Sequence, residues 1–115
     1  MGKINVGKDF SEDPIGRYRS DSDSSGQAFR EDFLKPALDK LKPGEKLEII
    51  LDDGVEAYGS SFLVEGFAGL VNYGYYSKED LLGKLAFTFS DEDFEFYKDK
   101  IIEYINESRF KSKTK

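Results

Sequence analysis

The chain has 115 residues, 38% of them hydrophobic and 15% aromatic, with a formal net charge of −6. This length predicts one domain, residues 1–110, large enough to hold a core without disulfides. The acidic balance argues against nucleic acids and anionic membranes as partners. The chain contains neither cysteine nor histidine. It therefore has no Ser-His-Asp triad, no Cys-His dyad and no cysteine-based zinc site of its own.

The missing catalytic motifs, signal peptide and membrane span predict a non-enzymatic protein of the cytoplasm that carries no cofactor and no metal. No apolar run is long enough to span a bilayer, and no signal peptide opens the sequence. Residues 111–115 contain three lysines and are expected to form a disordered basic tail.

The first third of the chain predicts a strand, a loop and a helix. Residues 3–7 alternate weakly and predict a short strand, and residues 9–25 are polar and predict a long loop. From Gln27 to Leu41, apolar residues recur every three or four positions, which is typical of a helix. Ser24 or Ser25 is expected to cap this helix, and Pro36 predicts a kink or restart within it.

The middle of the chain predicts a buried strand followed by a second helix. Residues 47–51 form a short apolar run expected of a strand covered on both faces, and Asp52 and Asp53 follow it. A helix is predicted over residues 61–73, with Ser60 as its N-cap and Ser61 as the more exposed serine.

The last third predicts a short helix over residues 77–82, a strand over 85–89 and a helix that continues to Ile105. Strands and helices therefore alternate along most of the chain. Such alternation predicts an α/β domain with right-handed crossovers and a mostly parallel or mixed sheet on which the helices pack.

Two separated segments resemble a known family. The first contains Gly16-Arg17-Tyr18, Ser25-Gly26 and Phe29-Arg30-Glu31, followed by Leu34 and Pro36. The second runs from Tyr58 through Ser60-Ser61 to Leu63 and continues with Glu65, Phe67, Gly69 and Leu70. In this order they resemble the prokaryotic STAS-like domain family of unknown function, over roughly residues 4–105.

The resemblance implies a STAS-like fold and a regulatory role. The family takes its name from anti-sigma-factor antagonists, switch proteins that bind a histidine-kinase-like ATPase and are phosphorylated on a serine at a helix start. Ser60 and Ser61 match the serines of that pattern, which makes them phosphorylation candidates. Gly59 stands where the pattern has Asp and Phe62 where it has Gly, so the match at the helix start is incomplete.

Two kinds of site at this helix start follow from the residues. A protein partner would contact the face made by the candidate residues Gly59, Ser61, Phe62, Glu65, Gly69 and Asn72. Alternatively, Arg17 and Arg30 would join the helix start to hold an anionic small molecule, as a binding module or an enzyme. Helix capping without further function explains Ser60 and Ser61 equally well. Gly66 and Gly69 predict close approach of another backbone, from a partner or from the chain itself.

Residues 21–32 resemble a calcium-binding EF-hand loop, but we predict that they bind calcium negligibly. Asp32 is short where a bidentate Glu is expected, and no entering helix precedes Asp21. Titration calorimetry with calcium should therefore show no binding in the micromolar range. A micromolar affinity that is lost in Asp21→Ala would contradict this prediction.

Overall fold

The structure is a computed structural model that describes residues 2–110, so the predicted tail at 111–115 lies outside the described residues. Its strands form one three-stranded parallel sheet of order β1-β2-β3, built from β1 (Gly2–Asn5), β2 (Leu47–Ile50) and β3 (Leu85–Thr88). Ile4, Ile49 and Phe87 lie side by side in this sheet. The predicted α/β class and all three predicted strands are confirmed, but β1 ends at Asn5, and Val6–Phe10 form a helical segment where the end of the strand and the start of a loop were expected.

Two long helical runs, each with a π-helical middle, connect the strands. The first comprises α1 (Gly26–Phe29), η2 (Arg30–Leu34) and α2 (Lys35–Asp39), and the second comprises α3 (Ser60–Leu63), η3 (Val64–Ala68) and α4 (Gly69–Asn72). The other helical segments are η1 (Val6–Phe10), α5 (Lys78–Lys84), η4 (Glu92–Phe94) and α6 (Glu95–Glu107). No helix within residues 2–110 is both long and apolar enough to cross a membrane.

Local sequence signals set the helix boundaries much as predicted. The Ser25 hydroxyl accepts a hydrogen bond from the Ala28 amide and caps α1. Ser77 caps α5 in the same way. Pro36 stands in the first turn of α2, where π-helical hydrogen bonding gives way to α-helical bonding. The backbone stays helical through this point, so the predicted restart is a change of hydrogen-bond pattern within one run.

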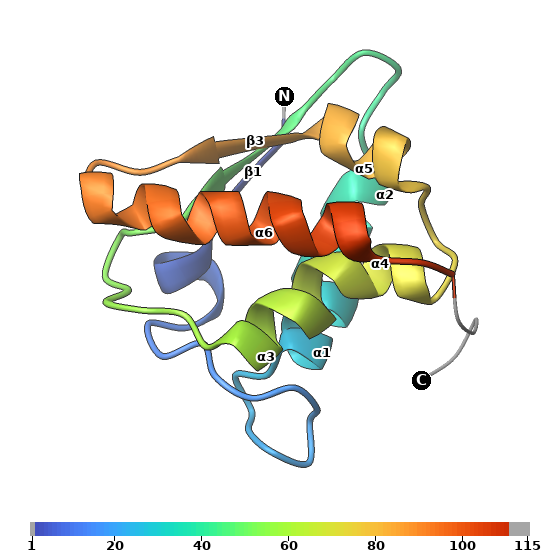
Figure 1. The fold of residues 1–115 in the computed structure, drawn as a ribbon. Coiled ribbons are helices and arrows are strands. Elements are labelled where there is room, and N and C mark those ends of the chain that lie inside the picture. Colours follow the sequence, from blue (N-terminus) through green and yellow to red (C-terminus); the bar gives the residue numbers. More distant parts are fainter. Residues whose placement is uncertain (1, 111–115) are drawn as a thin grey trace.

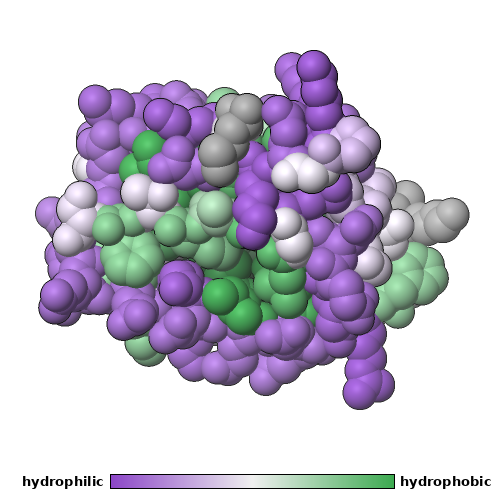
Figure 2. Space-filling view, turned by 90° about the horizontal axis from the view of Figure 1, so that it is seen from above, coloured by the Kyte–Doolittle hydropathy of each residue, from purple (hydrophilic) through white to green (hydrophobic). Residues whose placement is uncertain are grey.

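The two long helical runs and α6 lie on one face of the sheet, and α5 lies beyond the end of β3 (Figure 1). In the order β1-β2-β3, both crossover connections step in the same direction across the sheet. Because crossovers are right-handed, two such connections place their helices on the same side of the sheet. Leu47 and Ile49 point to this side and are buried, whereas Glu48 and Ile50 alternate with them and are half-buried. The expectation that β2 is covered on both faces is therefore wrong. Apolar surface crosses the middle of the uncovered side, framed by hydrophilic residues (Figure 2).

The core between sheet and helices is rich in aromatic rings. The ring of Phe29 lies 5.3 Å from Phe10, 5.5 Å from Phe62 and 5.6 Å from Phe67. Phe29, Phe62 and Phe67 are completely buried. These contacts join η1, the first helical run and the second run into one core.

The two acidic residues after β2 hold the neighbouring strand ends. The Asp52 carboxylate accepts hydrogen bonds from the amides of Ser90 and Asp91, at 2.7 and 2.8 Å. The Asp53 carboxylate accepts one from the side-chain amide of Asn5 at 2.8 Å. This acidic turn therefore fastens the carboxyl ends of β1 and β3 to that of β2.

The backbones of the two long helical runs approach closely at Gly26 and Gly66. A Cβ atom on Gly26 would lie 2.5 Å from the Phe62 carbonyl oxygen and 2.8 Å from the Gly66 nitrogen. The close approach predicted at Gly66 is thus confirmed, and the approaching backbone belongs to the chain itself. The prediction is wrong for Gly69, where the neighbour is the Arg30 side chain.

We predict that Gly26→Ala lowers the free energy of unfolding by about 1–3 kcal/mol, because backbone atoms must move to admit the methyl group. Gly83→Ala is the matched control, since a Cβ there would meet no atom within 4 Å. The control should raise the free energy of unfolding by roughly 0.5–1 kcal/mol through helix propensity. Urea unfolding measures both, and equal effects of the two variants would contradict the close approach.

Candidate functional site

The start of the second helical run differs from the prediction by one residue. Gly59 is the N-cap, with extended backbone and no side-chain capping bond, and Ser60 is the first helical residue. Ser60 is exposed, whereas Ser61 is half-buried. The predictions that Ser60 caps the helix and that Ser61 is the more exposed serine are therefore wrong. The chain remains extended through Gly59, so the capping position falls on a residue without a hydroxyl.

The loop before α1 folds back and covers Ser61. Two backbone hydrogen bonds hold the loop in this position: the Gly26 amide donates to the Gly16 carbonyl at 2.9 Å, and the Gln27 amide donates to the Arg17 carbonyl at 3.0 Å. Gly16 has a φ of 95°, which favours glycine at this bend. The loop thereby places the Arg17 guanidinium 3.4 Å from the Ser61 hydroxyl, to which it donates a hydrogen bond.

A recess of about 530 Å³ lies between this loop and the helix start. Its lining comes from both segments: Ile15, Gly16, Arg17, Tyr18 and Asp21 from the loop, and Gly59, Ser60 and Ser61 from the helix start. Ile15 is 61% exposed at its rim. The recess thus combines an exposed hydroxyl, an arginine and an exposed apolar side chain.

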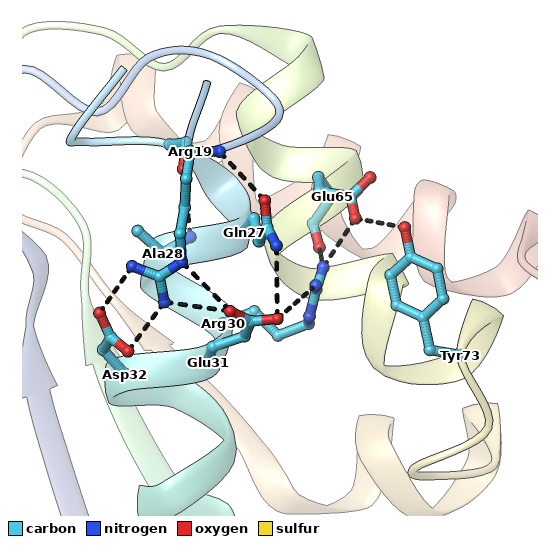
Figure 3. Close-up of polar contacts among 9 residues, drawn as sticks. Arg19, Gln27, Ala28, Arg30, Glu31, Asp32, Glu65 and Tyr73 are labelled. Carbon is cyan, nitrogen blue, oxygen red and sulfur yellow. Dashed lines mark hydrogen bonds and ion pairs between the residues drawn. The ribbon is translucent and has the colours of Figure 1, made fainter. Parts of the chain in front are cut away.

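A buried ion pair lies behind this recess and joins the two helical runs. Arg30 is 2% exposed and Glu65 is 4% exposed. The Arg30 Nη1 atom lies 2.8 Å from the Glu65 carboxylate and 2.6 Å from the Glu65 carbonyl oxygen (Figure 3). One hint of this pair is visible in the sequence, because Glu65 is the one charged residue between Phe62 and Val71.

Tyr73 completes the buried pair. Its hydroxyl donates a hydrogen bond to the Glu65 carboxylate, and its ring lies 4.6 Å from the Arg30 guanidinium carbon (Figure 3). Burial, and next the hydrogen bond to Glu65, raise the pKa of the Tyr73 hydroxyl above its ordinary value. Tyr73 therefore remains a neutral donor to Glu65 throughout the physiological pH range.

The two arginines proposed for an anion site both turn toward Glu65. Arg30 is enclosed with its partner, and the Arg17 guanidinium lies 3.8 Å from the other carboxylate oxygen of Glu65. Arg17 also lines the recess and is partly exposed. Of the two, Arg17 is the arginine placed to meet a ligand from solution.

The predicted partner face is mostly turned inward. Phe62, Glu65 and Gly69 are buried. Gly69 leaves space for the Arg30 side chain, since a Cβ there would lie 2.5 Å from Nη1. Asn72 stays half-buried, with its side-chain oxygen accepting a hydrogen bond from the Arg109 amide. Of the predicted face, Gly59, Ser61 and Asn72 are therefore partly accessible, and the exposed Ser60 adjoins Gly59 and Ser61 at the helix start.

The residues of the EF-hand-like segment have other contacts. Arg19 lies 2.9 Å from the Asp32 carboxylate and 3.0 Å from that of Glu31 (Figure 3). The Asp21 carboxylate accepts a hydrogen bond from the Tyr18 amide. These contacts form a turn and an exposed ion-pair cluster over residues 18–32.

Comparison with known proteins gives one match. A family model described as a STAS-like domain of unknown function matches residues 25–93, from the N-cap of α1 into η4. No curated protein and no solved structure matches the chain. The resemblance found in the sequence is confirmed, and the matched residues include Arg30, both serines and Glu65.

We predict that Glu65→Gln lowers the free energy of unfolding by about 3 kcal/mol, because it removes the buried carboxylate beside Arg30 and leaves that charge with the partly exposed Glu31 alone, at 3.6 Å. Asp32→Asn is the matched control, since its pair with Arg19 is exposed, and it should cost less than about 1 kcal/mol. Urea unfolding at neutral pH compares them. Similar losses in both variants would show that the Arg30–Glu65 pair does not fix the helical packing.

Proposed function

This chain belongs to the family of STAS-like domains of unknown function, and we propose that it is a non-enzymatic switch that binds a protein partner through the helix start at Ser60. One observation carries the proposal: Ser60 is an exposed hydroxyl in a recess that also presents Arg17 and Ile15. Phe62, Glu65 and Gly69 of the predicted partner face are buried, so a partner would contact the helix start and the loop over residues 15–21.

The position of Ser60 suits reversible phosphorylation. It stands at the first position of the helical run 60–72, where free backbone N–H groups and the helix dipole favour negative charge. Its hydroxyl makes no capping bond, so modification would break no contact that holds the helix. Ser61 is the less suitable candidate, because its hydroxyl is engaged by Arg17.

Phosphorylation would alter the surface more than the core. A phosphate on Ser60 would attract Arg17 and repel Asp21, both of which line the recess. Glu65 would keep Arg30 and Tyr73 as partners. The loop would therefore change its conformation while the helical packing stays intact.

The resemblance to anti-sigma-factor antagonists supports a histidine-kinase-like ATPase of the cytoplasm as the partner and kinase. The alternative is a binding module or enzyme for an anionic small molecule, which the same recess and Arg17 support. Inorganic phosphate that shifts the NMR amide signals of residues 59–62 without any protein partner would favour this alternative.

We predict that Ser60→Asp weakens binding to the histidine-kinase-like ATPase of the native host at least about tenfold, or roughly 1.4 kcal/mol. The introduced carboxylate should draw Arg17 as a phosphate would. Ser60→Ala should bind like the wild type and unfold at the same urea concentration, because the hydroxyl caps nothing.

Gly83→Asp is the control for added charge, because Gly83 is exposed, has open space for a side chain and lies outside the recess. Calorimetry or surface plasmon resonance measures all four proteins. If Ser60→Asp binds like the wild type, the switch assignment fails. If the wild type does not bind, the ATPase is not the partner.

A further inference from the structure

Ile15 presents an exposed apolar side chain from a fixed backbone, at the rim of the recess at Ser60. It is 61% exposed, more than any other large apolar residue within residues 2–110. Its amide donates a hydrogen bond to the Ser24 carbonyl at 3.1 Å, and Pro14 beside it is buried. The backbone of Ile15 is therefore held in place while its side chain lies in solvent. An apolar group that is positioned before binding loses little entropy when a partner covers it.

A second recess, of about 610 Å³, adjoins the recess at Ser60, and Ile15 and Gly59 line both. The loop after η1 and the turn after β2 form this second recess, with residues 12–15 and 54–59. A Cβ on Gly59 would meet no atom within 4 Å, so the passage between the recesses is open at this residue. The two recesses therefore form one continuous surface that includes Ile15.

The second recess is acidic. Three carboxylates line it, and no lysine or arginine does: Glu12, Asp13 and Glu56. All three residues are exposed, and none forms an ion pair within the part of the chain that the structure describes. The recess at Ser60 adds one carboxylate, that of Asp21, and one arginine, Arg17, which lies 3.8 Å from Glu65. The joined surface thus has four carboxylates, three from the second recess and one from the first, against a single arginine. It attracts positive charge.

We propose that this surface binds a basic segment of a protein partner, which covers Ile15 with apolar side chains and places a lysine or arginine in the acidic recess. The segment continues past Gly59 to the helix start at Ser60. Apolar contact at Ile15 contributes affinity, and the carboxylates select a basic partner over an acidic one. This binding mode rests on the proposed function, since it assigns the segment to the partner that contacts Ser60.

Other occupants fit this surface less well. A metal ion needs several ligating side chains close together, and no group of three or more that could hold one occurs among the described residues. A second copy of the chain would bring the same acidic surface to both sides of a two-fold interface, and two chains of net charge −6 would repel each other. A nucleic acid would be repelled by the same carboxylates. A basic segment of a different protein meets none of these obstacles.

The test is a selection of random peptides of about twelve residues displayed on phage, with the full chain as the target. We expect enrichment of peptides that combine lysine or arginine with apolar residues. A synthetic peptide from the enriched set should bind at least about tenfold more weakly to Ile15→Ala, which removes the apolar contact. It should bind at least about fivefold more weakly to Glu56→Lys, which reverses one charge of the acidic recess. Calorimetry measures these affinities.

Two matched controls should bind this peptide like the wild type. Phe96→Ala removes an apolar side chain of nearly the same exposure, 60%, from α6. Asp99→Lys makes the same change in net charge at an exposed residue of α6, and both positions lie outside the two recesses. These controls separate binding at this surface from general attraction between a basic peptide and an acidic chain.

Two further measurements support the comparison. Circular dichroism confirms that each variant is folded. In the wild type, the peptide should shift the NMR amide signals of residues 12–16 and 54–60, a measurement that needs no variant. Where the histidine-kinase-like ATPase binds the wild type, the peptide should displace it.

Four results would overturn the proposal. They are no enrichment, an enriched set that is acidic, a peptide that binds either Ile15→Ala or Glu56→Lys as tightly as the wild type, and ATPase binding that the peptide leaves unchanged. The proposed function fails separately. A wild type that binds the peptide but not the ATPase would contradict the choice of that partner alone, whereas ATPase binding without any selected peptide would contradict the basic segment alone.

Discussion

The ion pair between Arg30 and Glu65 determines how the two long helical runs fit together. Both side chains are almost completely buried, and the contact between them, at 2.8 Å, is the shortest ion pair that either makes. Such a pair adds little net stability, because desolvation offsets the attraction, but separating the partners is costly. Sliding one run along the other would break this contact and leave Arg30 with Glu31 alone, at 3.6 Å. The pair therefore selects one register, and the glycines at 26, 66 and 69 provide the close approach that this register requires.

Once the helical runs are packed in this way, the choice of functional surface is narrow. The one-directional strand order places the helices of the crossovers on one face, and their apolar sides are used by the core. A partner is left with loops, helix starts, the outer sides of the helices, the uncovered side of the sheet and the strand edges. The recess at Ser60 is a surface of this kind, made by a loop and a helix start.

Local signals in the sequence were enough to predict the fold class, while long-range contacts decided the site. Periodicity and serine caps predicted the strands and helices because they act over a few residues. The orientation of the helix at 60–72 was not predictable, since residues 62–71 are nearly all apolar or small and show no polar side. The capping residue was misplaced by one position, because the extended backbone at Gly59 depends on the preceding turn. The two arginines gave no sign that they meet at Glu65, which lies 35 residues after Arg30.

Arg17 is the element that connects this buried arrangement to the surface. Glu65 is contacted by both arginines, but its short contacts are with Arg30 and Tyr73, while Arg17 lies at 3.8 Å and is partly exposed. Arg17 is thus able to move away from Glu65 without leaving a buried charge unpaired. Movement of Arg30 would break the buried ion pair. Arg17 also donates to Ser61, beside the exposed Ser60. A negative charge at the helix start would compete with Glu65 for Arg17, and it would not compete for Arg30. The loop that carries Arg17 is therefore able to move in response to a surface event while the register of the helices, fixed by the other arginine, is retained.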